Sequence, residues 1–428
     1  MRKRKVEKDD KKEEKKEKKV SLVKKVKKSF KKKRNKEPSS YGLLEVIIVA
    51  FIFTLFGIVI GYLLNYGRDT YTGKKIPKSV EEFIDAYESI HENYYGKLDE
   101  NKLIEAAING MVNSLDDPYS GYMNEEDASE FDEETTGSYV GIGVTVEYSD
   151  SINKIIEVNK EAPAYKAGMK EGDIIIEVDG TDVTNLFGDD LSSLIRGEAG
   201  SPVDVKVKRG DKVILFKITR EKIDLISVSG YTIANNGKKV GVITISSFSS
   251  NTSKQFNKVI KQFEKEEVDC LVIDVRNNLG GQLAQVRNIL DVFFDKNTVL
   301  FQVKSKNDTV KIKASDNKKK NYPVAVVINN GSASASEVLA ACFKDNYKKV
   351  FIVGEQSFGK GTVQKTVSLK GGGKYKYTVE QWLTPKGKWI EGDGITPTHK
   401  VSNTEEYYNN PSYDNDDQLK KAIELVSK

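Results

Sequence analysis

The sequence has few of the side chains that most often carry covalent catalysis, metal binding or cross-linking. Its 428 residues include two histidines, two cysteines, four methionines and two tryptophans. The histidines, His91 and His399, lie in an early helical segment and in a loop close to the C-terminus, and neither stretch is typical of a catalytic site. A Ser-His-Asp triad is therefore not expected, and the sequence implies no metal and no organic cofactor.

The scarcity of cysteine also argues against a disulfide framework. Cys270 and Cys342 both lie in apolar runs. In such surroundings a cysteine behaves as a small apolar side chain. We expect both to be buried free thiols rather than a disulfide or metal ligands.

An excess of positive charge is confined to the start of the chain. The formal net charge is +5, but residues 1–40 contain 20 Lys/Arg and 7 Asp/Glu, so the remainder is acidic. A segment so rich in lysine and glutamate and so poor in apolar residues predicts disorder. We interpret residues 1–40 as a basic disordered tail; a nucleic-acid-binding arm is the alternative, and no nucleic-acid partner is predicted.

One long apolar run follows this tail. Val46–Leu64 contains 19 uncharged residues, and Tyr41, Tyr62 and Tyr66 lie near its ends. A helix of this length spans a bilayer, and tyrosine favours the two interfaces. No convincing signal-peptidase site follows, so we predict an uncleaved single-pass anchor over residues 42–65. Because basic flanks stay inside, the N-terminus should be cytoplasmic and the remainder should lie on the extracytoplasmic side of the cell membrane.

The stretch from Pro323 to Thr366 has the pattern of an α/β site. Val324–Ile328 predicts a buried strand, Ser336–Lys344 a helix and Val350–Val353 a second strand. The sharp turn between the first strand and the helix presents Ser334 beside a helix N-terminus, which carries partial positive charge. Ser334 is the candidate nucleophile.

A serine hydroxyl is a weak nucleophile until a base takes its proton. Lys360 lies between Gly359 and Gly361 in the loop after the second strand. It is the candidate base, because burial disfavours the ammonium form of lysine. Lowering a lysine pKa from ~10.4 to near neutrality requires about three units, or roughly 4 kcal/mol, which an apolar site can supply.

Two other interpretations of these residues stay open. Ser334 and Glu337 fit the capping-box pattern, so the serine could serve only to cap the helix. Residues 354–360 imitate a phosphate-binding loop after a strand, which would suggest an NTPase. That motif needs Ser or Thr after the lysine and then a helix, whereas Gly361 and a strand-like stretch follow here.

The sequences GSASASE at 331–337 and GEQSFGKGTVQ at 354–364 make the chain resemble the carboxyl-terminal processing peptidases, the S41-type serine proteases with a PDZ domain and a Ser-Lys dyad. The likeness extends over residues 79–401. It implies Ser334 as nucleophile, Lys360 as general base and Gln364 as the residue that orients the lysine. Four residues of a strand span ~13 Å, so Gln364 reaches Lys360 only if the segment curls locally.

The segment Asp274–Gly281 matches the D-x-R-x-N-x-G-G pattern of the same family. Tandem glycines at the carboxyl end of a core strand expose backbone N–H groups. Together with the amide of Ala335, the amide of Gly280 or Gly281 is predicted to form an oxyanion hole, in which one donor commonly contributes ~3–4 kcal/mol. The aspartate and arginine of this segment are expected to brace the loop.

Residues 137–222 change to short strands with glycine turns and resemble a PDZ domain. Gly141 and Gly143 expose backbone N–H groups that can hold a terminal carboxylate, and the strand after them can accept a peptide as an added strand. Ile142 and Val144 would receive the last side chain of that peptide. The alternative is that these glycines serve only a tight turn. In the same domain Arg196 is either a gating contact with the protease core, as the resemblance implies, or a surface charge.

The predicted fold is α/β with a single N-terminal transmembrane helix, a helical segment, an inserted PDZ domain and a core that the resemblance implies to be crotonase/ClpP-like. Leu115–Met123 resembles the turn before the PDZ domain in this family, and we assign it no chemical role. The terminal helix either covers the core or mediates self-association as a homo-oligomer. In order, the predicted parts are the tail (1–40), anchor (42–65), linker (67–78), helical segment (79–131), PDZ domain (137–222), protease core (223–402) and C-terminal helix (403–428).

These features predict a membrane-anchored serine endopeptidase that recognises protein C-termini through its PDZ domain and cuts peptide bonds through an acyl-enzyme. Its partners would be protein or peptide substrates with exposed C-termini and the membrane. The alternative is a catalytically silent, membrane-tethered PDZ scaffold. A decayed enzyme would be expected to have lost Ser334, Lys360 or the glycine pair, and all are present.

Overall fold

The computed structural model describes residues 70–71, 74–149, 152–316 and 320–428. The predicted tail at 1–40 and the predicted anchor at 42–65 lie outside these residues. Within the described ranges, no helix has the length and apolar character needed to cross a bilayer. The chain divides after Leu98 into two units, which are described in turn.

The described part of the first unit is mostly exposed. It contains the short strands β1 (Thr70–Tyr71) and β2 (Lys74–Lys75) and the helix α3 (Lys78–Asn93). The helix begins directly after Pro77, whose fixed φ suits a helix start, and it has no buried residue. His91 is exposed and stacks on Tyr87 with 5.9 Å between ring centroids, in line with a structural histidine.

The second unit begins with α4 (Glu100–Asn113), β3 (Gly121–Met123) and α5 (Glu125–Thr136). Side chains of Asp99 and Asn124 accept backbone N–H groups in the first turns of the two helices, as N-caps commonly do. The predicted helical segment therefore contains a three-residue strand that the sequence pattern did not indicate.

A β-rich region follows, with strands in the antiparallel order β10-β9-β7-β6-β5. Val203, Val205 and Val207 alternate along β9 and are buried, which is the two-residue period of a half-buried strand. β5 has one strand neighbour and so forms the edge of this sheet. The elements are β4 (Ser138–Gly141), β5 (Val144–Ser149), β6 (Ile152–Val158), α6 (Pro163–Ala167), β7 (Ile174–Val178), β8 (Thr181–Asp182), α7 (Asp189–Ile195), β9 (Pro202–Arg209), β10 (Lys212–Thr219) and β11 (Glu221–Asp224), which pairs with β4.

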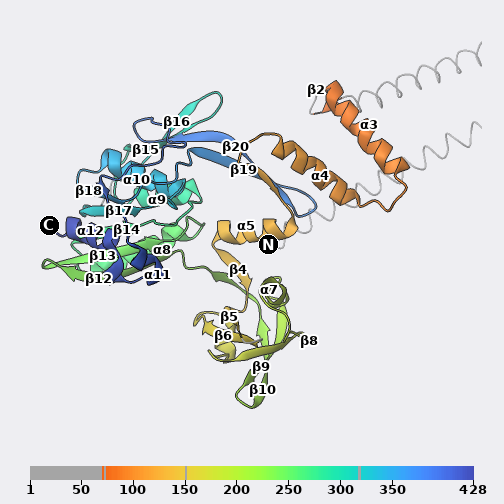
Figure 1. Ribbon diagram of the computed structural model, residues 1–428, viewed down its shortest axis with the longest axis horizontal. Helices are drawn as coiled ribbons and strands as arrows, with labels where there is room; N and C mark the ends of the chain where they lie inside the picture. The colour runs from red at the N-terminus through yellow and green to blue at the C-terminus, as the bar shows by residue number, and fades with distance from the viewer. Residues whose placement is uncertain (1–69, 72–73, 150–151, 317–319) are drawn as a thin grey trace, which may run out of the picture. The chain divides into compact units, whose positions relative to one another are not determined.

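The α/β region is built on a sheet of order β12-β13-β14-β17-β18-β21 (Figure 1). β12 pairs antiparallel with β13 at one edge, and the other pairs are parallel. Its elements are β12 (Val228–Asn235), β13 (Lys238–Ile245), α8 (Thr252–Lys265), β14 (Cys270–Asp274), α9 (Leu283–Leu290), β17 (Val324–Ile328), α10 (Ala335–Asn346), β18 (Val350–Gly354), β21 (His399–Lys400), α11 (Glu405–Asn409), a 3₁₀ turn (Tyr413–Asn415) and α12 (Asp417–Val426).

Helices cover both faces of this sheet. Ile273 and Val326 belong to the apolar cluster that includes residues of α8, α9 and α10, while Val272 and Val327 belong to the cluster with α12. Neighbouring strand residues point to opposite faces, so strands buried on both sides read as continuous apolar runs. The predicted terminal helix is therefore a packing element, because α12 covers one face of the core (Figure 1).

A second, antiparallel sheet has the order β16-β15-β20-β19, and β3 pairs with β20. Its strands are β15 (Val299–Lys304), β16 (Thr309–Lys313), β19 (Thr362–Ser368) and β20 (Lys374–Leu383). Cys270 and Cys342 are buried and free, as predicted. His399 lies in β21, partly exposed, with its ring against Phe351.

Candidate active site

Ser334 occupies the corner between β17 and α10. It is the residue before the first turn of α10, with φ 53° and ψ −112°. A residue with a side chain seldom adopts positive φ, and holding it there costs about 1–3 kcal/mol. A strained strand-to-helix turn is an established way to present a nucleophilic serine, so the corner suits the predicted role.

The Glu337 carboxylate ties this corner to the loop that carries Lys360. It is fully buried and accepts the backbone N–H of Ser334 at 2.8 Å and that of Lys360 at 2.9 Å through the same oxygen. The N–H of Gly359 and the hydroxyl of Ser357 bind the other oxygen at 2.7 and 2.6 Å. Burial raises the pKa of Glu337, and these hydrogen bonds oppose that rise. The backbones of the candidate nucleophile and base are therefore neighbours.

Capping explains only part of what Glu337 does. The capping-box pattern accounts for its bond to the Ser334 N–H, since that is the reciprocal bond of such a box. The bonds to Gly359 and Lys360 join α10 to a loop more than 20 residues later in the chain. Glu337 is thus a functional candidate that the sequence analysis considered only as a cap.

Lys360 lies in the loop between β18 and β19, and its side chain is half-buried. Its carbonyl accepts the indole N–H of the buried Trp382 at 2.7 Å, which fixes the backbone. Its Nζ atom lies 4.7 Å from the centroid of the Tyr119 ring. The amine therefore contacts an aromatic face from the turn to which the sequence analysis assigned no chemical role.

The surroundings of Lys360 favour the neutral amine. Burial lowers its pKa from the ordinary value of 10.5, and the positive charge of Lys376 lowers it further. The carboxylates that act in the opposite direction are Glu391, Asp117 and Glu337. A lowered lysine pKa is what a general base needs near neutral pH.

Gln364 lies on β19 beside a register shift in its pairing with β20. Its Nε2 atom donates to the hydroxyl oxygens of Thr362 and Thr378, both at 3.0 Å. The local curl that the sequence analysis required is therefore limited to this irregularity in an otherwise extended strand. In this arrangement the Gln364 amide hydrogens go to the two threonines, and its role in orienting Lys360 stays a prediction.

The two glycines predicted for the oxyanion hole have different neighbours. A Cβ added to Gly280 would lie 2.8 Å from the Ser334 Cβ and 3.0 Å from the Ala335 nitrogen. A Cβ on Gly281 would instead lie 2.5 Å from the carbonyl oxygen of Phe248. Gly280 thus borders the nucleophile corner, although its N–H donates to the Asn278 side chain at 2.9 Å. Which amide would bind an oxyanion stays open.

Arg276 braces the loop after β14 through ion pairs. Its guanidinium binds Asp274 at 2.6 Å and Asp416 at 2.7 Å. The Asp416 side chain also caps α12 by accepting the N–H of Leu419. This network joins the glycine loop to the terminal helix, in keeping with a bracing role.

The residues predicted to hold a substrate C-terminus lie between β4 and β5. Ile142 is buried, with 1% of its surface exposed, and its carbonyl accepts the N–H of Ala164. Gly143 has φ 82°, and a Cβ there would lie 2.2 Å from that of Ala162, so this close approach requires glycine. Gly141 ends β4, Val144 begins β5, and the free edge of β5 leaves room for an added strand. Carboxylate binding by this loop stays a prediction.

Arg196 directly follows α7 and contacts α5, the helix that precedes the β-rich region. It forms an ion pair with Glu133 of α5 at 3.0 Å and lies over the Tyr139 ring, 5.6 Å from its centroid. Both partners line, with Arg196, a groove of about 680 Å³ between α5, β4 and α7. Its partner is thus a helix that leads into the region, and the gating role stays a prediction.

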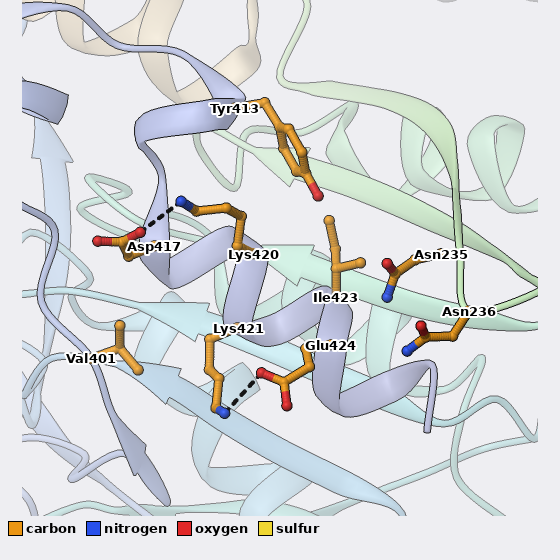
Figure 2. Close-up of a pocket in the computed structure, with 9 residues that line it drawn as sticks. All are labelled: Asn235, Asn236, Val401, Tyr413, Asp417, Lys420, Lys421, Ile423 and Glu424. Carbon is orange, nitrogen blue, oxygen red and sulfur yellow. Dashed lines mark hydrogen bonds and ion pairs between the residues drawn. The ribbon is translucent and has the colours of Figure 1, made fainter.

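A separate hollow of about 470 Å³ lies against α12 (Figure 2). Two ion pairs within the helix, Lys420 with Asp417 and Lys421 with Glu424, neutralise most of its charged lining. None of the predicted site residues lines it. The candidate chemistry therefore lies at the corner of β17 and α10 rather than in this hollow.

Comparisons with known proteins agree with the arrangement of the chain. Residues 239–401 match the model of peptidase family S41, residues 140–219 a PDZ domain, and residues 65–127 the N-terminal domain of the activating protease CtpB. The chain is 40% identical over 356 residues to the carboxy-terminal processing protease CtpB of Bacillus subtilis (strain 168), covering 81% of this chain and 72% of the relative.

The similarity to a second relative extends over a comparable length. The chain is 37% identical over 365 residues to the carboxy-terminal processing protease CtpA of the same organism, covering 84% of this chain and 76% of the relative. Among solved structures, a photosystem II D1 C-terminal processing protease is 27% identical and has a TM-score of 0.45, with 76% of this chain and 94% of that chain covered.

Proposed function

The chain belongs to the carboxy-terminal processing proteases of peptidase family S41, which are serine peptidases with a PDZ domain, and from this premise we propose that it cuts peptide bonds with a Ser334–Lys360 dyad. The observation that carries the proposal is the Glu337 carboxylate, which binds the backbone N–H groups of both residues. A nucleophile and its base must lie within hydrogen-bond reach of each other when they react.

In the first half of the reaction, neutral Lys360 takes the proton of the Ser334 hydroxyl as the oxygen attacks the peptide carbonyl. The resulting oxyanion lies against the amide of Ala335 and that of Gly280 or Gly281. Lys360, now an ammonium, returns the proton to the departing amine. A covalent ester between Ser334 and the N-terminal fragment remains.

In the second half, Lys360 takes a proton from water, and the resulting hydroxide attacks the ester. Ser334 recovers its proton from the ammonium and the new C-terminus leaves. Both halves need a neutral amine, so the rate should rise with pH as Lys360 loses its proton. Burial and Lys376 both lower the pKa of Lys360, which supports this use of the residue.

The PDZ domain offers a loop and a free strand edge that suit capture of a substrate C-terminus. We propose that the loop from Gly141 to Val144 binds the terminal carboxylate of a protein substrate. The C-terminal segment of that substrate would add a strand to the free edge of β5. A peptide ending in a carboxamide should then bind at least several-fold more weakly than its free acid, as measured by fluorescence anisotropy. Equal affinities would contradict this mode of capture.

We also propose that residues 42–65 anchor the chain in the cell membrane with the catalytic part outside the cytoplasm. The 19-residue uncharged run and the basic tail before it support this topology. In cells whose layers outside the cell membrane have been removed, externally added protease should digest the catalytic part of the chain. It should leave the N-terminal tail intact. Protection of both parts would contradict the topology.

The dyad is tested by cleavage of an unfolded protein with the full chain. Ser334→Ala and Lys360→Ala should each lower kcat/KM by a factor of about 10³ or more, since the hydroxyl and its base act as one unit. Ser368→Ala and Lys365→Ala are matched controls, because both side chains are exposed on β19. Cutting by the dyad variants at the control rate would refute the mechanism. Peptide binding without cutting by the wild-type chain would favour the silent PDZ scaffold instead.

A further inference from the structure

The turn before β3 is fixed onto the strand that borders the candidate base. The Asp117 carboxylate accepts the N–H of Tyr119 at 3.1 Å and the hydroxyl of Ser120 at 2.5 Å. The Ser120 hydroxyl oxygen accepts the N–H of Thr378 on β20 at 3.1 Å. β3 then continues along β20, with Gly121 paired to Lys376. The backbone of Tyr119 therefore has a defined position on this sheet.

The hydroxyl end of the Tyr119 side chain is close to the loop that carries the amine. Burial and the nearby charge of Glu391 raise the pKa of the Tyr119 hydroxyl. The Glu391 carboxylate also accepts the N–H of Gly361 at 2.6 Å, and Gly361 directly follows Lys360.

The face of the Tyr119 ring is directed at Lys360. The 4.7 Å from Nζ to the ring centroid is within the roughly 6 Å at which an aromatic face attracts a cation. This attraction depends on charge, so it stabilises the ammonium and not the neutral amine. The same turn is linked to Gln364 through Thr378, whose hydroxyl accepts a hydrogen bond from the Gln364 amide at 3.0 Å and whose N–H donates to the Ser120 hydroxyl at 3.1 Å.

We propose that Tyr119 is a positioning residue for Lys360. Its ring face holds the ammonium form in a resting arrangement, and the amine leaves the ring after losing a proton to water and then takes the proton of Ser334. This inference rests on the proposed dyad. The charged groups around the amine are Lys376 on β20, Glu391 in the loop before β21, Asp117 in the turn and Glu337 on α10. Tyr119 differs from all of them, because it adds no net charge and acts only through contact.

The pH dependence of kcat/KM in the full chain tests this role. Tyr119→Leu removes the ring face, so the ammonium is less stable and the acid limb of the profile should move to lower pH by about half a unit to one unit. Tyr119→Phe keeps the ring face and loses only the hydroxyl, so its acid limb should coincide with that of the wild type. Tyr122→Leu, on the neighbouring strand β3, is the matched control and should leave the limb in place.

Direct titration separates positioning from a general structural role. With ¹³C-labelled lysine in the Ser334→Ala chain, the Lys360 midpoint should fall by the same amount on adding Tyr119→Leu and stay unchanged on adding Tyr119→Phe. If Tyr119→Leu lowers the melting temperature strongly, Tyr119→Met fills a similar volume and gives the same comparison.

Two outcomes would overturn the inference. One is a folded Tyr119→Leu or Tyr119→Met variant with an unmoved acid limb and Lys360 midpoint. The other is an equal shift in Tyr119→Phe, which would assign the effect to the hydroxyl. If Ser334→Ala or Lys360→Ala cut at the wild-type rate, the dyad itself fails. An intact dyad with an unmoved limb refutes only the role of Tyr119.

Discussion

The corner that carries Ser334 and the loop that carries Lys360 share one carboxylate but are built in different ways. At the corner, three features of the backbone position Ser334. Its φ is positive, its N–H donates to Glu337, and the Cα of Gly280 lies against the Ser334 side chain. Every one of these contacts depends on the chain path. The proposed nucleophile is therefore positioned by the conformation of the backbone.

The side chain of the proposed base, Lys360, is positioned in a different way. Its N–H and carbonyl are held by Glu337 and Trp382, but the amine at the end of the side chain is surrounded by other side chains. The ring of Tyr119 contacts it, and the charges of Lys376 and Glu391 act on its pKa. Changes at the corner should therefore abolish activity, whereas changes around the amine should move its pH dependence.

Outside the dyad itself, the largest effect is expected where the two regions join. Glu337→Gln leaves one acceptor oxygen for four donors and turns an N–H₂ group toward them, so buried N–H groups lose their partners. Activity should fall by a factor of about 10² or more, and the free energy of unfolding by about 2–5 kcal/mol. Cleavage assays and denaturant unfolding measure both quantities.

Ser357→Ala is the control for this change, because it removes one donor and leaves the three backbone bonds of Glu337 in place. Its loss of activity should be clearly smaller. If Glu337→Gln retained wild-type activity and stability, the carboxylate would not be the junction of the two regions.

The next effect concerns the corner alone. Gly280→Ala would place a methyl group 2.8 Å from the Ser334 Cβ and from the carbonyl of Ala333, at a φ of 105° that alanine rarely adopts. We expect kcat to fall at least about tenfold at every pH, with destabilisation of about 1–3 kcal/mol from the backbone strain.

Gly237→Ala is the matched control, since its φ is 74° and an added Cβ would meet nothing within 4 Å. It carries the backbone strain without the clash, so it should be destabilised yet remain active. Equal loss of kcat in the two variants would show that the corner is sensitive to stability rather than to its own geometry.

The smallest effect concerns the amine. Lys376 disfavours the ammonium of Lys360, so Lys376→Gln should raise the pKa of Lys360 and move the acid limb of kcat/KM to higher pH. The shift should be below about one unit for a partly screened charge. Lys365→Gln, exposed on β19, is the control. A shift to lower pH would contradict the assignment.

The difference between the two regions also explains what the sequence could predict. The buried strands β14, β17 and β18, the helix α10 and the glycine loop are local patterns, and each lies close to its predicted position. The corner is made of such patterns. Ser334 and its helix could therefore be identified from adjacent residues alone.

The surroundings of the amine could not be identified in this way. β3 has three residues and no periodicity of its own. The turn before it is joined to β20 by the bond between Ser120 and Thr378, which are 258 positions apart. The contact of Tyr119 with Lys360 exists only because of that pairing. The sequence signal present was the Asp-Pro-Tyr-Ser word at 117–120, whose partner on β20 no local pattern could indicate.

The most direct test of the account is a titration of the Lys360 amine in the full chain. Ser334→Ala, with ¹³C-labelled lysine and the signal assigned by its loss in Lys360→Arg, would allow the midpoint to be read without turnover. The account predicts a midpoint below the ordinary lysine value of 10.5, because burial and Lys376 disfavour the ammonium. A midpoint at or above 10.5 would contradict the use of this lysine as the base for Ser334.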